Sequence, residues 1–134
     1  MTVSRTETLP LAVEADIVVA RREAKSWASQ LGFSLVDQTK LVTACSELAR
    51  NTLVYGGGGT LTMQALDAFP RKGLRLIFED HGPGIADLDL ALTDGYTSGG
   101  GMGLGLSGAK RLCNEFDIVT APGAGTKVTV ARWK

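Results

Sequence analysis

Hydrophobic positions recur at a helical period of three to four residues in two long stretches of the chain. The first stretch covers residues 16–31 and is followed by Gly32, a natural left-handed helix stop. The second begins after Ser34, which is a favourable N-cap, and continues to about Tyr55. A third, shorter helix is expected over residues 104–115. The pattern therefore predicts three helices.

Elsewhere apolar and polar residues alternate, which is the period of a strand with one buried face. These strands are expected over residues 6–13, 60–66, 74–79, 116–121 and 126–133. Pro10 favours an edge position for the first strand. Turns around Pro70-Arg71-Lys72-Gly73 and Pro122-Gly123-Ala124-Gly125 join the later strands in pairs. The predicted fold is α+β: a two-layer sandwich of a mostly antiparallel sheet covered on one face by helices.

Glycine changes this picture, because it is enriched and clustered. The 134 residues include 17 glycines, about 13% of the chain, against an average near 7%. Four stand at 56–59, nine lie between Gly82 and Gly108, and two flank Ala124. The clusters indicate places where bare backbone is required. No linker or shift in composition marks a boundary, so we expect residues 1–134 to form a single domain.

Charge and cysteine usage exclude several classes of function. Acidic and basic residues balance at 14 each, and no run of like charge reaches five residues, so neither nucleic acid nor an anionic membrane is indicated as a partner. No apolar run is long enough to span a bilayer, and the first residues lack an apolar signal core. Cys45 and Cys113 have neither metal-ligand nor CxxC spacing. We therefore expect a cytoplasmic protein.

Glu47 and Asn51 lie four residues apart on the second predicted helix, so both project from the same face. An amide oxygen such as that of Asn51 can bind a hard cation such as Mg²⁺. A carboxylate such as that of Glu47 can accept or orient a proton. Polar pairs of this spacing are also common on solvated helix faces, so the pair gains weight only from the motifs that follow.

Asp80 stands at the end of an apolar strand, immediately before a tight bend at Gly82-Pro83-Gly84. A carboxylate there can accept a hydrogen bond from an exocyclic amine such as that of adenine, a charged bond of about 1.5–3 kcal/mol. An ordinary Asp-containing turn has the same local sequence. Thr126 follows Gly123-Ala124-Gly125, and we expect its hydroxyl to support the Asp80 contact from a neighbouring strand.

A glycine-rich segment leads directly into the third predicted helix. It contains Gly99, Gly100, Gly101, Gly103, Leu104, Gly105 and Leu106. Consecutive backbone N–H groups form a concavity suited to phosphate oxygens, and the helix N-terminus adds partial positive charge. We expect residues 99–105 to act as a lid, although a flexible surface loop would share these glycines. A dinucleotide-binding motif is rejected because no strand of a parallel βαβ unit precedes the segment, and no P-loop or protein-kinase motif is present.

Together these segments resemble the GHKL (Bergerat-fold) ATPases, the superfamily of gyrase, Hsp90, histidine-kinase catalytic domains and MutL. The similar motifs are the N box (Glu47-x-x-x-Asn51), the first glycine box (Asp80-x-Gly82-x-Gly84), the second (Gly103-Leu104-Gly105-Leu106) and the last (Gly125-Thr126). The resemblance covers essentially the whole chain. It implies ATP and Mg²⁺ as ligands, with Asn51 on the metal, Glu47 as catalytic base and the other motif residues around the nucleotide.

Within that superfamily the chain is most similar to the small anti-sigma and switch-kinase branch, and there to the RsbT-type stressosome kinases. The similarity lies in residues 46–51, 95–100 and 110–112. It implies a kinase that phosphorylates a serine or threonine of a STAS-domain partner, then binds and activates a PP2C-type phosphatase. Anti-sigma factors usually carry histidine four residues after the box asparagine, where this chain has Tyr55. The alternative is a nucleotide-dependent binding regulator, such as an anti-sigma factor, without obligatory phosphoryl transfer.

Overall fold

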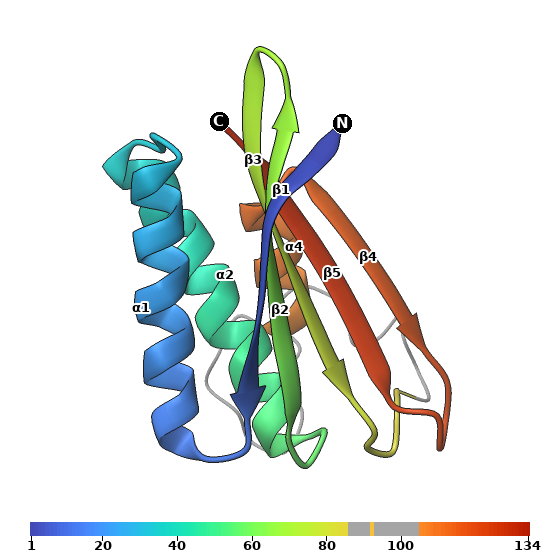
Figure 1. Cartoon of the computed structure of the whole chain (residues 1–134). Helices are drawn as coiled ribbons and strands as arrows, with labels where there is room; N and C mark the ends of the chain where they lie inside the picture. Colours follow the sequence, from blue (N-terminus) through green and yellow to red (C-terminus); the bar gives the residue numbers. More distant parts are fainter. Residues whose placement is uncertain (86–91, 93–104) are drawn as a thin grey trace.

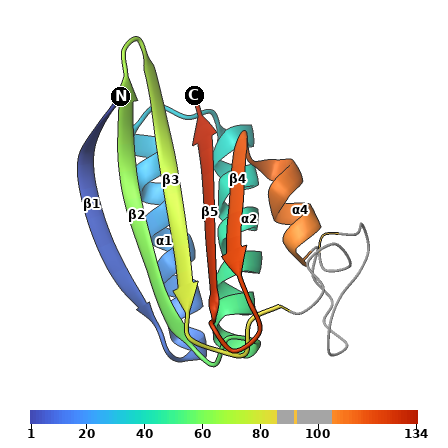
Figure 2. The same cartoon turned by 90° about the vertical axis from the view of Figure 1, so that its right-hand side faces the viewer.

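A computed structural model describes residues 1–85, 92 and 105–134 of the chain. The elements are β1 (Thr2–Leu11), α1 (Glu14–Gln30), α2 (Leu35–Val54), β2 (Gly59–Ala68), β3 (Arg71–Asp80), α4 (Gly105–Leu112), β4 (Glu115–Thr120) and β5 (Thr126–Trp133). The strands form one five-stranded sheet in the order β1-β2-β3-β5-β4. Every neighbouring pair is antiparallel. The described helices lie on one face of the sheet, which confirms the predicted α+β sandwich (Figures 1 and 2).

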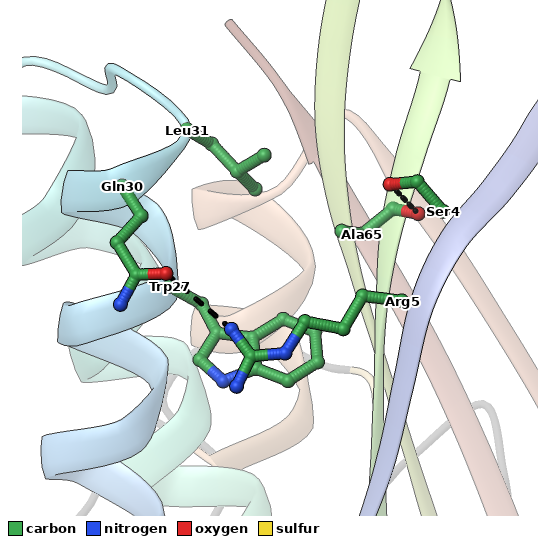
Figure 3. A pocket seen from close by; sticks show the side chains of 6 residues that line it. All are labelled: Ser4, Arg5, Trp27, Gln30, Leu31 and Ala65. Carbon is green, nitrogen blue, oxygen red and sulfur yellow. Dashed lines mark hydrogen bonds between the residues drawn. The ribbon is translucent and has the colours of Figure 1, made fainter.

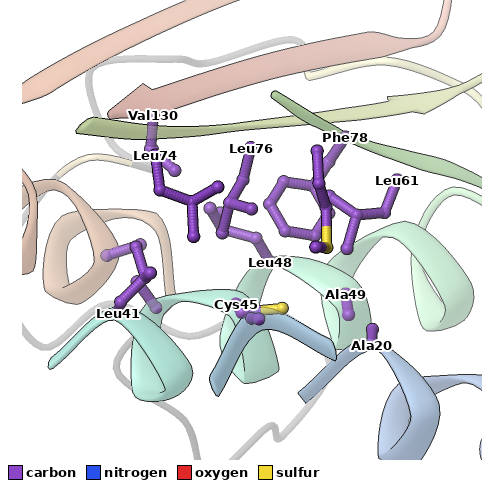
Figure 4. Close-up of a cluster of buried hydrophobic side chains, with 14 of the residues drawn as sticks. Ala20, Leu41, Cys45, Leu48, Ala49, Leu61, Leu74, Leu76, Phe78 and Val130 are labelled. Carbon is purple, nitrogen blue, oxygen red and sulfur yellow. The ribbon is translucent and has the colours of Figure 1, made fainter. Parts of the chain in front are cut away.

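The core lies between the sheet and the helices, because alternate residues of each strand point toward the helices. Phe78 on β3 pairs with Leu61 on β2 and with Val128 on β5, so these three side chains share one face. All three are buried and belong to one apolar cluster. Figure 4 shows Phe78 and Leu61 of this cluster together with Leu48 of α2. Since the strand period is two, Asp80 points to this same helix-facing side, at the end of the core.

Two of the local signals at the helix ends are confirmed. Gly32 has a φ of +88°, the left-handed conformation that ends α1. The hydroxyl of Ser34 accepts a hydrogen bond from the amide of Asp37 at 3.2 Å and so caps α2. Among the residues that the structure describes, no helix combines the length and the hydropathy needed to span a bilayer.

The first strand differs from the prediction at both ends. It begins at Thr2, since Thr2 and Val3 pair with β2 ahead of an irregularity between Val3 and Arg5 that breaks the alternation. It ends at Leu11, before the predicted Val13. The cause is the carboxylate of Asp16, which accepts hydrogen bonds from the amides of Ala12 (2.8 Å) and Val13 (3.1 Å) and turns the chain into α1.

The β2–β3 connection and α4 are both shorter than predicted. Arg71 already pairs with Ala68, so the expected turn over residues 70–73 is reduced to Phe69-Pro70. Helix α4 ends at Leu112 and not at Glu115. Its end is set by β5, because Asn114 donates its amide to Ala131 (2.9 Å) and accepts the amide of Trp133 with its side chain (2.6 Å). The chain therefore enters β4 at once.

Arg132 links the start of α2 to the end of α4. Its guanidinium donates to the carboxylate of Asp37 at 2.7 Å and to the carbonyl of Leu112 at 2.8 Å. The hydrogen bond from Arg132 holds the pKa of the Asp37 carboxyl below its ordinary value of 3.8. This side chain of β5 thus positions both of the helices that carry predicted site residues.

Candidate nucleotide site

Asp80 is the last residue of β3 and lies in a row of residues across the sheet end. It pairs with Gly59 on β2 and with Thr126 on β5. Its Oδ1 accepts a hydrogen bond from the amide of Gly82 at 2.9 Å, which closes the first turn of the following loop. One carboxylate oxygen therefore shapes the backbone bend. Oδ2 is the oxygen left to bind a ligand.

The C-terminal end of α2 contacts Asp80 through bare backbone. The carbonyl of Asn51 accepts the amides of Tyr55 (3.0 Å) and Gly56 (3.1 Å), which brings the chain round at the helix end. Gly56 then lies directly against Asp80, where an added Cβ would come within 2.5 Å of Oδ2. An added Cβ at Gly82 would come within 2.7 Å of the Gly56 carbonyl oxygen. Only glycine allows these two segments to approach so closely.

The loop after Asp80 is also held by the β4–β5 turn. The amide of Gly123 donates to the carbonyl of Pro83 at 2.6 Å. Gly84 has a φ of +75° and packs against the carbonyl of Ala121, which leaves no room for a side chain. The predicted first glycine box therefore contacts the turn that leads into the last one, and Thr126 of the last box pairs with Asp80.

A hydroxyl that the sequence analysis did not identify stands beside Thr126. Thr120 ends β4 and pairs with Thr126, and the two hydroxyl oxygens are 2.9 Å apart. The Thr120 oxygen also accepts the amide of Ile85 at 2.9 Å. The alternation of β4 places Thr120 on the same face as Ile118, and this alternation was the sequence signal that could have identified Thr120 as a site residue. Thr126 therefore has a second threonine as its hydrogen-bonding neighbour, whereas the expected support of Asp80 by the Thr126 hydroxyl stays a prediction.

Glu47 and Asn51 lie on the half-buried part of α2. Within residues 1–85, 92 and 105–134, neither side chain forms a hydrogen bond or ion pair, so both polar ends are open to a ligand. Asn51 is connected to Asp80 through its backbone bond to Gly56. The helix carrying the predicted acid–amide pair therefore borders the Asp80 loop directly.

Only the end of the predicted second glycine box can be placed. Gly99, Gly100, Gly101, Gly103 and Leu104 lie outside the described residues. Gly105 is the first residue of α4 and has a φ of +64°. The side chain of Leu106 is buried in the core, which leaves its backbone to meet a ligand. Helix α4 packs against α2, so its N-terminus lies on the same helical layer as Asn51.

These groups suit a purine nucleotide with a bound cation. Asp80 offers a carboxylate oxygen to an exocyclic amine, the glycine contacts leave bare backbone around it, and Asn51 offers an amide oxygen to a hard cation. Glu47 provides a carboxylate one helical turn away on the same face. This donor set has the chemistry that a purine and a hard cation require.

A separate hollow of about 230 Å³ lies between the C-terminal end of α1 and strands β1 and β2 (Figure 3). It is lined by Ser4, Arg5, Trp27, Gln30, Leu31 and Ala65. The Arg5 guanidinium stacks 3.9 Å from the centre of the Trp27 ring and donates to the Gln30 side chain at 3.4 Å. Trp27 is only 1% exposed, so its role is packing.

The chain is similar to known proteins over most of its length. The family model of histidine kinase-, DNA gyrase B-, and HSP90-like ATPases matches residues 36–134. The chain is 43% identical over 120 residues to the serine/threonine-protein kinase RsbT of Bacillus subtilis (strain 168), covering 90% of each. It is 30% identical over 122 residues to an anti-sigma F factor of Shouchella clausii (strain KSM-K16), covering 84% of this chain and 81% of that factor.

Solved structures share the fold. The RsbU and RsbW domains of a Mycobacterium tuberculosis protein match with a TM-score of 0.64 and 20% identity. That match covers 96% of this chain and 32% of the other, so the chain spans about a third of it. The mycobacterial sensor histidine kinase MprB matches with a TM-score of 0.56 and 16% identity, over 96% of this chain and 97% of the kinase. At these identities the likeness concerns the fold alone.

Proposed function

The chain belongs to the family of histidine kinase-, DNA gyrase B- and HSP90-like (GHKL) ATPases, and from this premise we propose that it is a serine/threonine-protein kinase of a partner-switching system. It transfers the γ-phosphoryl group of ATP to a hydroxyl of a partner protein. The observation that carries the proposal is the contact of Gly56 with Asp80. This contact brings a base-recognising carboxylate and the Glu47–Asn51 helix to one end of the sheet.

Nucleotide binding is divided among three elements of the chain. Asp80 accepts a hydrogen bond from the exocyclic amine of adenine, with Thr126 beside it on β5. Gly82 and Gly84 keep the backbone next to the base free of side chains. The backbone amides at the start of α4, preceded by the expected lid over residues 99–105, receive the phosphates. The ligands are thus held mainly by backbone and by one carboxylate.

Catalysis requires positioning and charge neutralisation more than covalent participation by the protein. Asn51 would hold Mg²⁺ together with the phosphates; when bound, this ion neutralises charge on the triphosphate. Glu47 accepts the proton of the partner's hydroxyl as its oxygen bonds to the γ-phosphorus and the bond to the β–γ bridging oxygen breaks. ADP leaves with the electron pair of that bond. A positioned base of this kind typically contributes about 10²–10⁴ in rate.

The partners are proposed from the likeness to the Bacillus kinase. A STAS-domain protein is the substrate, and a PP2C-type phosphatase is bound and activated after the kinase leaves its substrate. Incubation with γ-labelled ATP and Mg²⁺ beside a STAS-domain partner tests the kinase directly. Label on a serine or threonine of the partner supports the proposal.

A second candidate function is a binding regulator that uses nucleotide only to set its shape. It is favoured by the 30% identity to an anti-sigma F factor. In the same experiment, a stable ATP-dependent complex without label on the partner would favour this second function and reject the kinase. Tyr55, at the position where anti-sigma factors usually carry histidine, argues for the kinase.

A further inference from the structure

The hydroxyl of Thr120 is the junction of three segments around the nucleotide site. It accepts the amide of Ile85 at 2.9 Å, at the end of the Asp80 loop. It donates to the carbonyl of Gly125 at 3.1 Å, in the turn between β4 and β5. It also lies 2.9 Å from the hydroxyl of Thr126. One side-chain oxygen on β4 thus meets the loop, the turn and the neighbouring strand.

Counting protons decides the direction of the bond between the two threonines. A threonine hydroxyl has one hydrogen to donate and two lone pairs to accept with. The hydrogen of Thr120 goes to the Gly125 carbonyl, and one of its lone pairs takes the Ile85 amide. All three contacts of Thr120 are satisfied together only when its remaining lone pair accepts from Thr126, so Thr126 is the donor in the fully satisfied arrangement. The Thr126 hydroxyl can then only accept a hydrogen bond from a ligand, through its lone pairs.

Thr126 stands directly opposite Asp80, and both side chains lie on the helix-facing side of the sheet. Oδ1 of Asp80 already accepts the amide of Gly82. The groups that this end of the sheet offers to a ligand are then Oδ2 of Asp80 and Oγ1 of Thr126, two acceptors on paired residues of neighbouring strands. At the position of the purine 6-substituent, two acceptors favour an amino group, which donates, and repel a carbonyl oxygen, which can only accept.

We propose that Thr120 is a positioning residue for base selectivity, holding the Thr126 hydroxyl as an acceptor beside Asp80 so that the site takes a 6-amino purine and rejects a 6-oxo purine. The inference rests on the proposed function, because it assigns how that same site recognises its nucleotide. In this proposal Thr120 itself does not contact the base. It acts through Thr126 and through the Ile85 end of the loop.

ATP and inosine triphosphate differ at the base only in replacing the 6-amino group by a 6-oxo group with N1 protonation, so their binding ratio measures this selectivity. The test compares Thr120→Val, which keeps the shape and removes the hydroxyl, with Thr120→Ser, which keeps the hydroxyl. Thr129→Val is the matched control, since Thr129 lies on the same sheet but points to the face without helices. Binding of both nucleotides is measured by calorimetry, and amide exchange at Ile85 by NMR without nucleotide.

Thr120→Val should lower the ATP-to-inosine-triphosphate preference about three- to tenfold, the loss expected for one hydrogen bond. It should also speed exchange of the Ile85 amide, whereas Thr120→Ser and Thr129→Val leave both quantities near wild type. An unchanged preference in Thr120→Val overturns the inference. A wild-type chain that binds neither nucleotide overturns the proposed function and the selectivity role together. In that case, faster exchange of the Ile85 amide in Thr120→Val would still show that the Thr120 hydroxyl holds the Ile85 end of the loop, and unchanged exchange would show that it does not.

Discussion

Gly56, at the end of the α2 segment, rests against the carboxylate of Asp80, at the end of β3, with no space for a side chain between them. The two residues belong to different layers of the sandwich, one following a helix and the other ending a strand. Their contact joins α2, which carries Glu47 and Asn51, to the loop after Asp80 that is predicted to recognise the base. A site assembled in this way depends on a missing side chain.

Replacing Gly56 by alanine should abolish tight nucleotide binding while the chain still folds. The added Cβ would come within 2.5 Å of Asp80 Oδ2, so the carboxylate must turn away from its ligand position. We expect ATP affinity to fall at least about tenfold, equivalent to one charge-assisted hydrogen bond. Calorimetric titration with ATP and Mg²⁺ measures the loss, and circular dichroism checks the fold.

Gly57→Ala is the matched control for this substitution. Its φ is +75° and an added Cβ meets nothing within 4 Å, so the variant pays only in backbone strain of about 1–2 kcal/mol. Its melting temperature should drop while its ATP affinity stays within about twofold of wild type. Equal loss of affinity in both variants would show that the glycine run matters for flexibility and not for room beside Asp80.

Acid should weaken the link between α2 and β5. The hydrogen bond from Arg132 keeps the pKa of Asp37 below 3.8, so the folded state releases this proton more readily than the unfolded state. The pair therefore contributes stability above pH 3.8, and this contribution is lost as the pH falls through the lowered pKa of the folded chain. Urea unfolding at a series of pH values from 7 to about 2.5 follows the effect.

In Asp37→Asn the acid-induced loss of stability should be shallower than in wild type, because the titrating partner of Arg132 is gone. Asp67→Asn serves for comparison, since it removes an exposed ion pair with Lys72 of 2.8 Å on the β2–β3 hairpin. Exposed pairs contribute little, so this variant should follow wild type. An Asp37→Asn profile that parallels wild type at every pH would contradict the assigned role of the Arg132 link.

Both cysteine thiols should be inert in the folded protein. Burial raises the pKa of Cys45 to about 12 and that of Cys113 to about 11. Because the thiolate is the reactive form, almost none is present near neutral pH. With Ellman's reagent at pH 7.5, release of the coloured thiolate should be slow in buffer and immediate for two thiols in denaturant. Rapid reaction of Cys45 in the native chain would mean that the packing of α2 is looser than described.

Local signals in the sequence predicted most of the fold. The helix stop at Gly32, the cap at Ser34 and the strand over residues 126–133 all depend on neighbouring residues in the chain, and the structure confirms them. The end of α4 was predicted too late because Asn114 is drawn to β5 by bonds to Ala131 and Trp133. Such partners are distant in sequence and leave no local pattern.

The same distinction applies to the candidate site. Asp80, Gly82, Gly84 and Thr126 carry recognisable motifs, and the structure places them together. Gly56 was visible only as part of a glycine run, since its use depends on the position of Asp80. Thr120 has no motif of its own, and its role follows from the register of β4 on β5. The roles of Glu47 and Asn51 remain predictions that rest on their chemistry.

Asn51→Ala should lose Mg²⁺-dependent nucleotide binding. The variant removes the amide oxygen proposed to hold the ion, while the backbone carbonyl that receives the Gly56 amide is retained. Titration of ATP with Mg²⁺ and again with a chelator measures this. Wild type should bind more tightly with the ion, and Asn51→Ala should show the same weak binding in both conditions. A variant that keeps the full Mg²⁺ effect would remove Asn51 from the proposed metal site.

Transfer of label from γ-labelled ATP to a STAS-domain partner, by wild type and by Glu47→Gln at saturating ATP, tests the central claim most directly. Glu47→Gln keeps the shape and hydrogen-bonding reach of the side chain but cannot accept the hydroxyl proton. We predict that it binds ATP within about twofold of wild type and transfers label about 10²–10⁴ times more slowly. Two results would contradict the claim that the chain is a kinase with Glu47 as its base. One is label transfer by Glu47→Gln at the wild-type rate, and the other is no label transfer by wild type.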